Sequence, residues 1–255
     1  MSTLQRFIQR VRTPEAFPAP PWGVPLGLGL GLAYLVVIFA AVLLVATLTD
    51  ADSEDLASAT LAGGHLLACL VMLLLFWQYT SLALSGSEPP NAPTLDYRQA
   101  LRWGPSRSTP IGSVMLVSLA LAAGLDTAGL VLGVPLDSLP TPLDDLPRAE
   151  TGAFLAALVV VVVLRPLVEE LIFRGVLYTT LRQRMSVWAA VVLSSAIFAA
   201  LHYAYDPTYL WWGLVQPLVL GLVAGLVRAS TQSTQAALAS HAMFGFFVML
   251  RALLA

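Results

Sequence analysis

Long, unbroken runs of apolar residues dominate the pattern along the chain. A helix that crosses a bilayer needs about 20 such residues. Seven runs meet this requirement, at residues 24–48, 60–84, 111–134, 152–183, 187–204, 208–228 and 234–254. The runs are continuous and do not alternate with polar residues, which excludes a transmembrane β-barrel. The pattern therefore predicts an all-α fold, a polytopic membrane bundle of about seven transmembrane helices.

Two runs carry features that bear on helix geometry. Gly27 and Gly31 in the first run form a pair of small residues four apart, which favours close helix packing. The fourth run, at 152–183, is longer than one crossing requires and contains Pro166. Because proline lacks an N–H and clashes with the preceding turn, we expect it to kink or interrupt that helix.

The composition narrows the class of protein further. Of the 255 residues, 58% are hydrophobic and 11% are charged, and the net charge is −2. A soluble domain carries about 25% charged residues. These values exclude a soluble enzyme and a disordered protein, and the absence of a positive field argues against a nucleic-acid partner. The single cysteine, Cys69, allows no internal disulfide and is predicted to be a buried small hydrophobic residue.

The charges of the connections predict the orientation and the parts of the chain. Arginines precede the first run and return in the connection at 85–110, whereas acidic residues fill the connection at 50–55. By the positive-inside rule the N-terminus is cytoplasmic, and we expect a multi-pass protein of the plasma membrane. The expected parts are a cytoplasmic segment at 1–23, N-terminal helices with a connector at 24–151, and a core at 152–255.

Ionisable residues inside a membrane are costly, so each is a candidate for function. The apolar runs contain or adjoin Asp126, Arg165, Glu169, Glu170, Arg174, His65, His202 and His241. We expect His65 to serve helix packing, Asp126 to lie at the interface, and Arg165 to extend outward toward it.

The remaining ionisable residues are predicted to converge. If the fourth and fifth runs form a hairpin that turns near residues 184–186, Glu169 and His202 both lie about 22 Å from the turn. His241 in the last run falls near the same layer. Glu170 and Arg174 are four residues apart, and an ion pair between them would leave Glu169 free on an adjacent helix face.

Two chemistries use one carboxylate and two imidazoles. In the first, Glu169 is a general base that activates water with His202, and His241 stabilises the oxyanion. In the second, Glu169, His202 and His241 hold a Zn²⁺ ion that lowers the pKa of bound water. The residues leave both open, so the cofactor is either none or Zn²⁺.

Three short motifs resemble those of a known family. Residues 169–175, Glu-Glu-Leu-Ile-Phe-Arg-Gly, resemble its EExxxR motif, and residues 198–202, Phe-Ala-Ala-Leu-His, resemble its FxxxH motif. His241 resembles the start of its HxxxN/D motif. The family is that of the CAAX protease and bacteriocin-processing proteins, which includes the Ras-converting CAAX endopeptidase. The resemblance spans residues 152–255, in the order of the family.

This resemblance implies an intramembrane endopeptidase, glutamate-dependent or metallo-, that acts on a hydrophobic or membrane-associated peptide or protein. It implies that Glu169 and His202 activate water, that His241 lies on the oxyanion side, and that Glu170, Arg174 and Phe198 support them. Gly245 departs from the family, because it stands where the motif has Asn or Asp. Three alternatives follow: another polar group, such as Ser240 or Gln235, takes this role, a water takes it, or activity is reduced. The alternatives are a non-catalytic membrane scaffold or immunity protein and, third, a small transporter.

Overall fold

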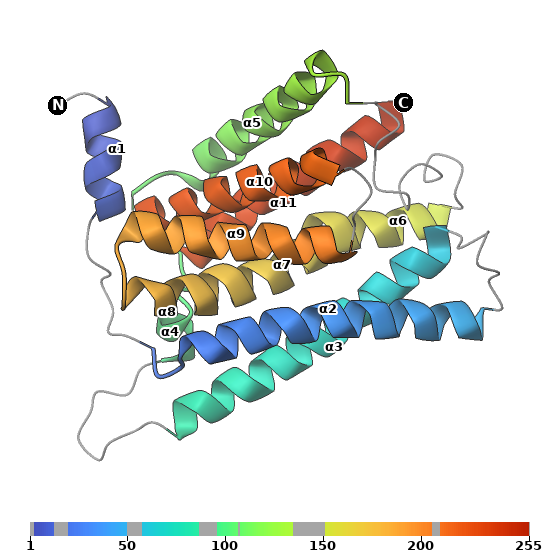
Figure 1. The fold of residues 1–255 in the computed structure, drawn as a ribbon, viewed down its shortest axis with the longest axis horizontal. Coiled ribbons are helices and arrows are strands. Elements are labelled where there is room, and N and C mark those ends of the chain that lie inside the picture. Colours follow the sequence, from blue (N-terminus) through green and yellow to red (C-terminus); the bar gives the residue numbers. More distant parts are fainter. Residues whose placement is uncertain are drawn as a thin grey trace.

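The computed structural model describes residues 3–12, 20–49, 58–86, 96–106, 108–134, 151–205 and 210–254. Within these ranges the chain forms helices and no strand. Figure 1 shows their arrangement: α1 (Thr3–Arg12), α2 (Val24–Leu48), α3 (Ser58–Ser85), α4 (Tyr97–Ala100), α5 (Ile111–Val131), α6 (Thr151–Val159), η3 (Val160–Leu164), α7 (Arg165–Glu170), η4 (Leu171–Leu177), α8 (Tyr178–Arg182), α9 (Val187–Tyr205), α10 (Leu210–Thr231) and α11 (Thr234–Leu254). Here η marks a π-helix.

The prediction of an all-α, seven-helix bundle is confirmed. Seven helical segments of the described chain are long and apolar enough to cross a membrane. Most boundaries agree with the prediction within two residues, and two differ by three residues. The third span ends at Val131, short of 134, because the chain turns at Gly133 with φ of +78°. The sixth span runs from Leu210 to Thr231 and so ends after 228, whereas residues 208 and 209 and the acidic connection at 50–55 lie outside the described residues.

The fourth span stays helical from Thr151 to Arg182, so the expected interruption at Pro166 takes a milder form. The turn before the proline widens into the π-helix η3, in which the N–H of Arg165 donates to the carbonyl of Val160, five residues earlier. Pro166 has no N–H to continue this pattern. A second π-helix, η4, follows the two glutamates. Such segments were not predicted, and in other proteins they often mark functional sites.

The fourth span forms the centre of the bundle. It packs against α2 and α3 on one side and against α11 on the other, while α9 and α10 pair beside it (Figure 1). The outward side chains of the spans are large and apolar, such as Leu32, Leu74 and Leu116, as a lipid-facing surface requires. The core of the membrane protein is therefore built around the segment that carries the two glutamates.

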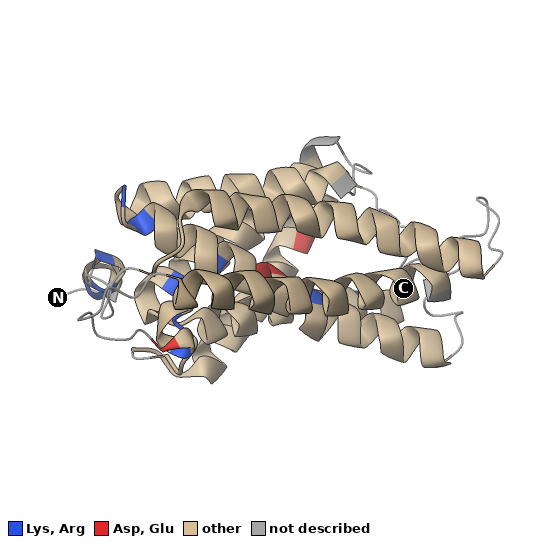
Figure 2. Ribbon diagram, turned by 90° about the horizontal axis from the view of Figure 1, so that it is seen from below, with Lys and Arg blue, Asp and Glu red and all other residues tan. Residues whose placement is uncertain are grey.

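Charge is distributed unevenly along the bundle. Figure 2 shows most arginines gathered at the end where α1 lies, and acidic residues in the middle of the bundle. Under the positive-inside rule the arginine-rich end faces the cytoplasm, and the cytoplasmic N-terminus stays a prediction.

The connector at 85–110 is more than a solvent-exposed link. In its described part, Ala100 and Leu101 are buried. The side chain of Thr234 donates to the carbonyl of Leu101 at 2.7 Å, and its N–H donates to the carbonyl of Arg102 at 3.0 Å. The connector thus holds the start of α11, the helix that carries His241.

Candidate functional site

Three charged residues of the EExxxR motif lie in the centre of the fourth span. Glu169 and Glu170 end α7, Arg174 lies in η4, and each of the three residues is 0% exposed. A charge so deeply buried is tolerated only with a partner of opposite charge and with hydrogen bonds.

Each glutamate has its own arginine. Arg174 Nη1 donates to Glu170 Oε1 at 2.6 Å, so the expected pair is present. Arg165 Nε donates to Glu169 Oε1 at 3.0 Å, which corrects two expectations: Arg165 does not extend outward, and Glu169 is not free of arginine. Both pairs join residues four apart on one helical segment. The charges cancel pair by pair, so the buried cluster is neutral when both histidines are neutral.

Arg174 also ties the fourth span to its neighbours. Its Nη2 donates to the carbonyl of Gly221 in α10 at 2.7 Å, and its guanidinium lies 4.9 Å from the centre of the Phe198 ring in α9. These contacts agree with a structural role, because one side chain connects three membrane helices.

The two histidines meet the first glutamate from separate helices. Glu169 Oε2 lies 3.5 Å from Nε2 of His202 in α9 and 3.5 Å from Nε2 of His241 in α11. His241 Nδ1 lies 2.9 Å from Glu170 Oε1. The structure therefore brings together the three residues that the sequence predicted to share one depth.

The hydrogen-bond partners assign the protons of both imidazoles. His202 Nδ1 faces the carbonyl oxygen of Phe198 at 3.2 Å, and His241 Nδ1 faces the Glu170 carboxylate. Both partners only accept, so Nδ1 carries the proton in each ring. In the neutral state the two Nε2 atoms are then acceptors, and they face a third acceptor, Glu169 Oε2.

Phe198 holds the imidazoles in place. Its ring centre lies 4.1 Å from that of His202 and 5.8 Å from that of His241, and Phe173 packs edge-on against it at 5.0 Å. Phe198 and His202 are four residues apart and share one face of α9, as the spacing predicted.

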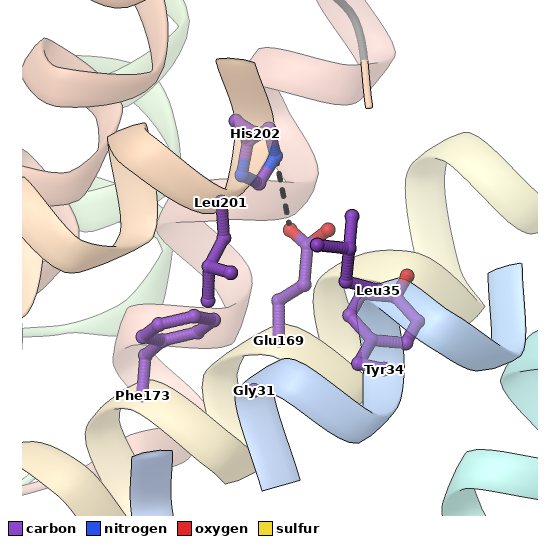
Figure 3. A pocket seen from close by; sticks show the side chains of 7 residues that line it. All are labelled: Gly31, Tyr34, Leu35, Glu169, Phe173, Leu201 and His202. Atoms are coloured by element: carbon purple, nitrogen blue, oxygen red, sulfur yellow. Dashed lines mark ion pairs between the residues drawn. The ribbon is translucent and has the colours of Figure 1, made fainter. Parts of the chain in front are cut away.

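A small cavity opens beside Glu169 and His202. Its walls are formed by Gly31, Tyr34 and Leu35 of α2, Glu169 and Phe173 of the fourth span, and Leu201 and His202 of α9 (Figure 3). Its volume is about 10 Å³, close to the space that one water molecule occupies. No motif in the sequence indicated the three residues of α2, although the Gly27–Gly31 pair indicated that this helix packs closely.

The family comparison covers the whole cluster. Residues 151–247 match the family model described as type II CAAX prenyl endopeptidase Rce1-like. This segment is similar to that family, and we refer to it as the Rce1-like domain. No curated protein and no solved structure matches the chain significantly. The domain implies endopeptidase activity in a multi-pass membrane protein, and it includes every residue of the three motifs but none of α2, α3 or α5.

Gly245 of the Rce1-like domain lies where the backbone of α11 touches the backbone of η3. A Cβ atom on Gly245 would collide with the carbonyl oxygen of Val161 in η3. This is the carbonyl that Pro166, lacking an N–H, cannot bond in the π-helical pattern. In this packing α11 therefore admits no side chain at 245, neither Asn nor Asp.

The two polar residues considered as substitutes point elsewhere. Ser240 is hydrogen-bonded to Ser118 of α5 at 2.7 Å. The amide of Gln235 donates to the carbonyl of Gly104 and accepts from Trp103 Nε1, each at 3.0 Å. Neither group is available to an oxyanion beside Glu169.

Other ionisable residues do not join the cluster. Asp126 forms an ion pair with Arg251, 125 residues later, and its position at the membrane interface stays a prediction. His65 Nδ1 bonds the carbonyl of Leu61 at 2.8 Å within its own helix.

Glu169, His202 and His241 are the zinc ligands that the sequence predicted. Within the described ranges, no group of three or more His, Cys, Asp and Glu side chains is arranged to hold a metal. Glu169 and the two histidines are ligand types that zinc accepts, but Oε1 of Glu169 already receives Arg165. Zinc binding by these residues stays a prediction.

Proposed function

We propose that this protein is an intramembrane endopeptidase that hydrolyses a peptide bond in a hydrophobic or lipid-associated substrate. Glu169 and His202 activate the water. The observation that carries the proposal is the convergence of three acceptors, Glu169 Oε2 and the two histidine Nε2 atoms, beside a buried cavity the size of one water. A water molecule carries two hydrogens, so it can donate to two of these acceptors at once.

In the proposed reaction, the water donates to Glu169 Oε2 and His202 Nε2. Glu169 takes one proton while the water oxygen attacks the carbonyl carbon of the peptide bond. The proton then passes to the amide nitrogen as the C–N bond breaks, which yields a carboxylic acid and an amine. Arg165 supports the ionised form of Glu169, because it offsets the cost of burying that charge.

We place His241 on the oxyanion side. With Nδ1–H bonded to Glu170, its Nε2 donates to an oxyanion only when the ring carries a second proton.

The family description and the walls of the cavity indicate the substrate class. The family name specifies CAAX prenyl peptides, and the cavity walls include apolar side chains, Leu35, Phe173 and Leu201. We infer that the substrate is a lipid-modified or hydrophobic peptide presented in the plasma membrane. Maturation of such a peptide is the role that this chemistry supports.

One observation favours a second candidate, a non-catalytic scaffold with the same fold. Gly245 removes the Asn or Asp of the third motif. The complete set of Glu–Arg and Glu–His contacts favours the enzyme, because a scaffold has no need to bury three acceptors around one point. A proton relay is less favoured, since Asp126 pairs with Arg251.

The test is cleavage in liposomes of internally quenched hydrophobic peptides and of a farnesylated CAAX peptide. Wild type should cleave, and Glu169→Gln and His202→Ala should each abolish cleavage. Asp126→Asn is the matched control, because it also removes a membrane carboxylate paired with an arginine and should retain activity. Cleavage that survives both site substitutions would contradict the assignment, and binding without cleavage in wild type would favour the scaffold.

A further inference from the structure

Tyr34 lines the cavity from a helix outside the Rce1-like domain. It lies in α2 and is only 4% exposed. Its hydroxyl is buried, and it has no hydrogen-bond partner among the nitrogen and oxygen atoms of the described residues. In Figure 3 its ring stands on the α2 side of the cavity that also contains Glu169 and His202.

A buried hydroxyl without a hydrogen bond is unfavourable, and most such groups in proteins are paired. The Cys69 thiol of α3 is a hydrogen-bond partner of the Tyr34 hydroxyl, but sulfur is only a weak acceptor, so the hydroxyl has no strong hydrogen bond. A phenylalanine would fill the same space without this cost. The weak pairing of the Tyr34 hydroxyl therefore indicates that its hydrogen-bond partner enters with the substrate.

Close helix packing fixes the position of Tyr34. A Cβ on Gly27 would come within 3.0 Å of the Leu177 backbone, and a Cβ on Gly31 within 3.0 Å of Leu201 Cδ1. The pair thus brings α2 against the fourth span and α9, as its spacing predicted. Tyr34 follows Gly31 by three residues and lies on the same face of the helix.

The site needs a neutral hydrogen-bond donor for the oxyanion. Glu169 Oε2 and both Nε2 atoms are acceptors in the charge-balanced state. The Asn or Asp of the third motif is replaced by Gly245, and Ser240 and Gln235 are bonded elsewhere. A phenol is neutral, remains protonated at neutral pH, and donates one strong hydrogen bond.

We propose that Tyr34 is a catalytic residue whose hydroxyl donates a hydrogen bond to the oxyanion formed when water attacks the peptide carbonyl. This inference rests on the proposed endopeptidase function. It assigns part of the catalytic site to α2, beyond residues 151–247, and it explains how the chain functions with glycine at position 245.

The test compares Tyr34→Phe with wild type, Glu169→Gln and Tyr97→Phe, using the same quenched peptides in liposomes. Tyr97 is the matched control: its hydroxyl bonds Thr80 at 2.8 Å, and it lines none of the cavity. Loss of an oxyanion donor lowers kcat about 10²–10³-fold. We expect this loss of kcat for Tyr34→Phe, with an unchanged KM and a melting temperature no lower than that of wild type. Tyr97→Phe should do the reverse, with an unchanged kcat and a lower melting temperature.

A second measurement separates transition-state binding from folding. A peptidyl trifluoromethyl ketone forms a hydrate that resembles the tetrahedral intermediate, whereas the matching peptidyl alcohol does not. Tyr34→Phe should weaken binding of the ketone by the same factor as kcat and leave binding of the alcohol unchanged.

The outcomes are distinct. If wild type cleaves, Glu169→Gln does not, and Tyr34→Phe keeps the wild-type kcat, the inference is wrong while the proposed function stands. Equal weakening of ketone and alcohol also overturns the inference. If wild type cleaves no better than Glu169→Gln, the proposed function fails, and the role of Tyr34 with it.

Discussion

Replacing Gly245 with alanine adds one methyl group at the point where α11 touches the π-helix η3. The new Cβ meets the carbonyl oxygen of Val161, which belongs to the backbone of a central membrane helix and cannot rotate away. Overpacking of this kind costs about 1–3 kcal/mol, and a rigid backbone neighbour favours the upper end. Alanine regains about 1 kcal/mol of helix propensity. The net loss should be about 2 kcal/mol, or about 30-fold in the unfolding equilibrium.

Gly29→Ala is the matched control. Gly29 lies within α2, and nothing lies within 4 Å of a Cβ built there. This substitution changes helix propensity alone, so it should leave stability unchanged or raise it by up to about 1 kcal/mol. Unfolding in mixed micelles by titration with a denaturing detergent measures both variants against wild type.

The same substitution should impair cleavage. His241 precedes Gly245 by one helical turn, so a shift of α11 away from η3 also moves the imidazole from Glu169 and Glu170. Gly245→Asn, which restores the motif residue, should be less stable still and should not raise activity. A Gly245→Ala variant as stable as Gly29→Ala would refute the reasoning.

Three further predictions concern the charged cluster and metal dependence. Arg174→Gln breaks a fully buried ion pair and should lower the free energy of unfolding by about 3–5 kcal/mol. Arg174→Lys should not restore this stability, because the single ammonium of lysine cannot replace the two guanidinium nitrogens that bond Glu170 and the Gly221 carbonyl. Arg165→Gln should lower kcat, because the partner of Arg165 is the proposed base, and it should change the free energy of unfolding less than Arg174→Gln, because the Arg165 side chain is 25% exposed. Equal kcat in Arg165→Gln and wild type would argue against a role of Arg165 in supporting the base. Finally, cleavage should persist after extensive dialysis against EDTA, and a loss that added zinc restores would instead support the metal mechanism.

Local spacing and span length made much of the site predictable. The pair between Glu170 and Arg174 follows from four-residue spacing on one helix. The meeting of Glu169 and His202 follows from equal distances to one hairpin turn. These features depend on few residues near one another along the chain, so the sequence is sufficient to predict them.

Other contacts depend on which side of each helix faces its neighbours in the bundle. Asp126 meets Arg251 across 125 residues, and Arg165 turns inward to Glu169 where the sequence allowed an outward direction. The π-helices η3 and η4 arise where the fourth span adapts to Pro166 and to its neighbours, and no pattern of apolar residues distinguishes them from α-helix.

Sequence alone therefore determined the membrane class, the number of spans and the three motifs, because bilayer thickness and helical spacing act locally. Only the tertiary structure decided that Tyr34 lines the cavity and that Gly245 is required where α11 meets η3. The physical reason is that a membrane helix is apolar on its lipid-facing and protein-facing sides alike. A helix such as α2 thus carries no polar stripe to reveal which side is inward, and close packing between backbones makes that choice.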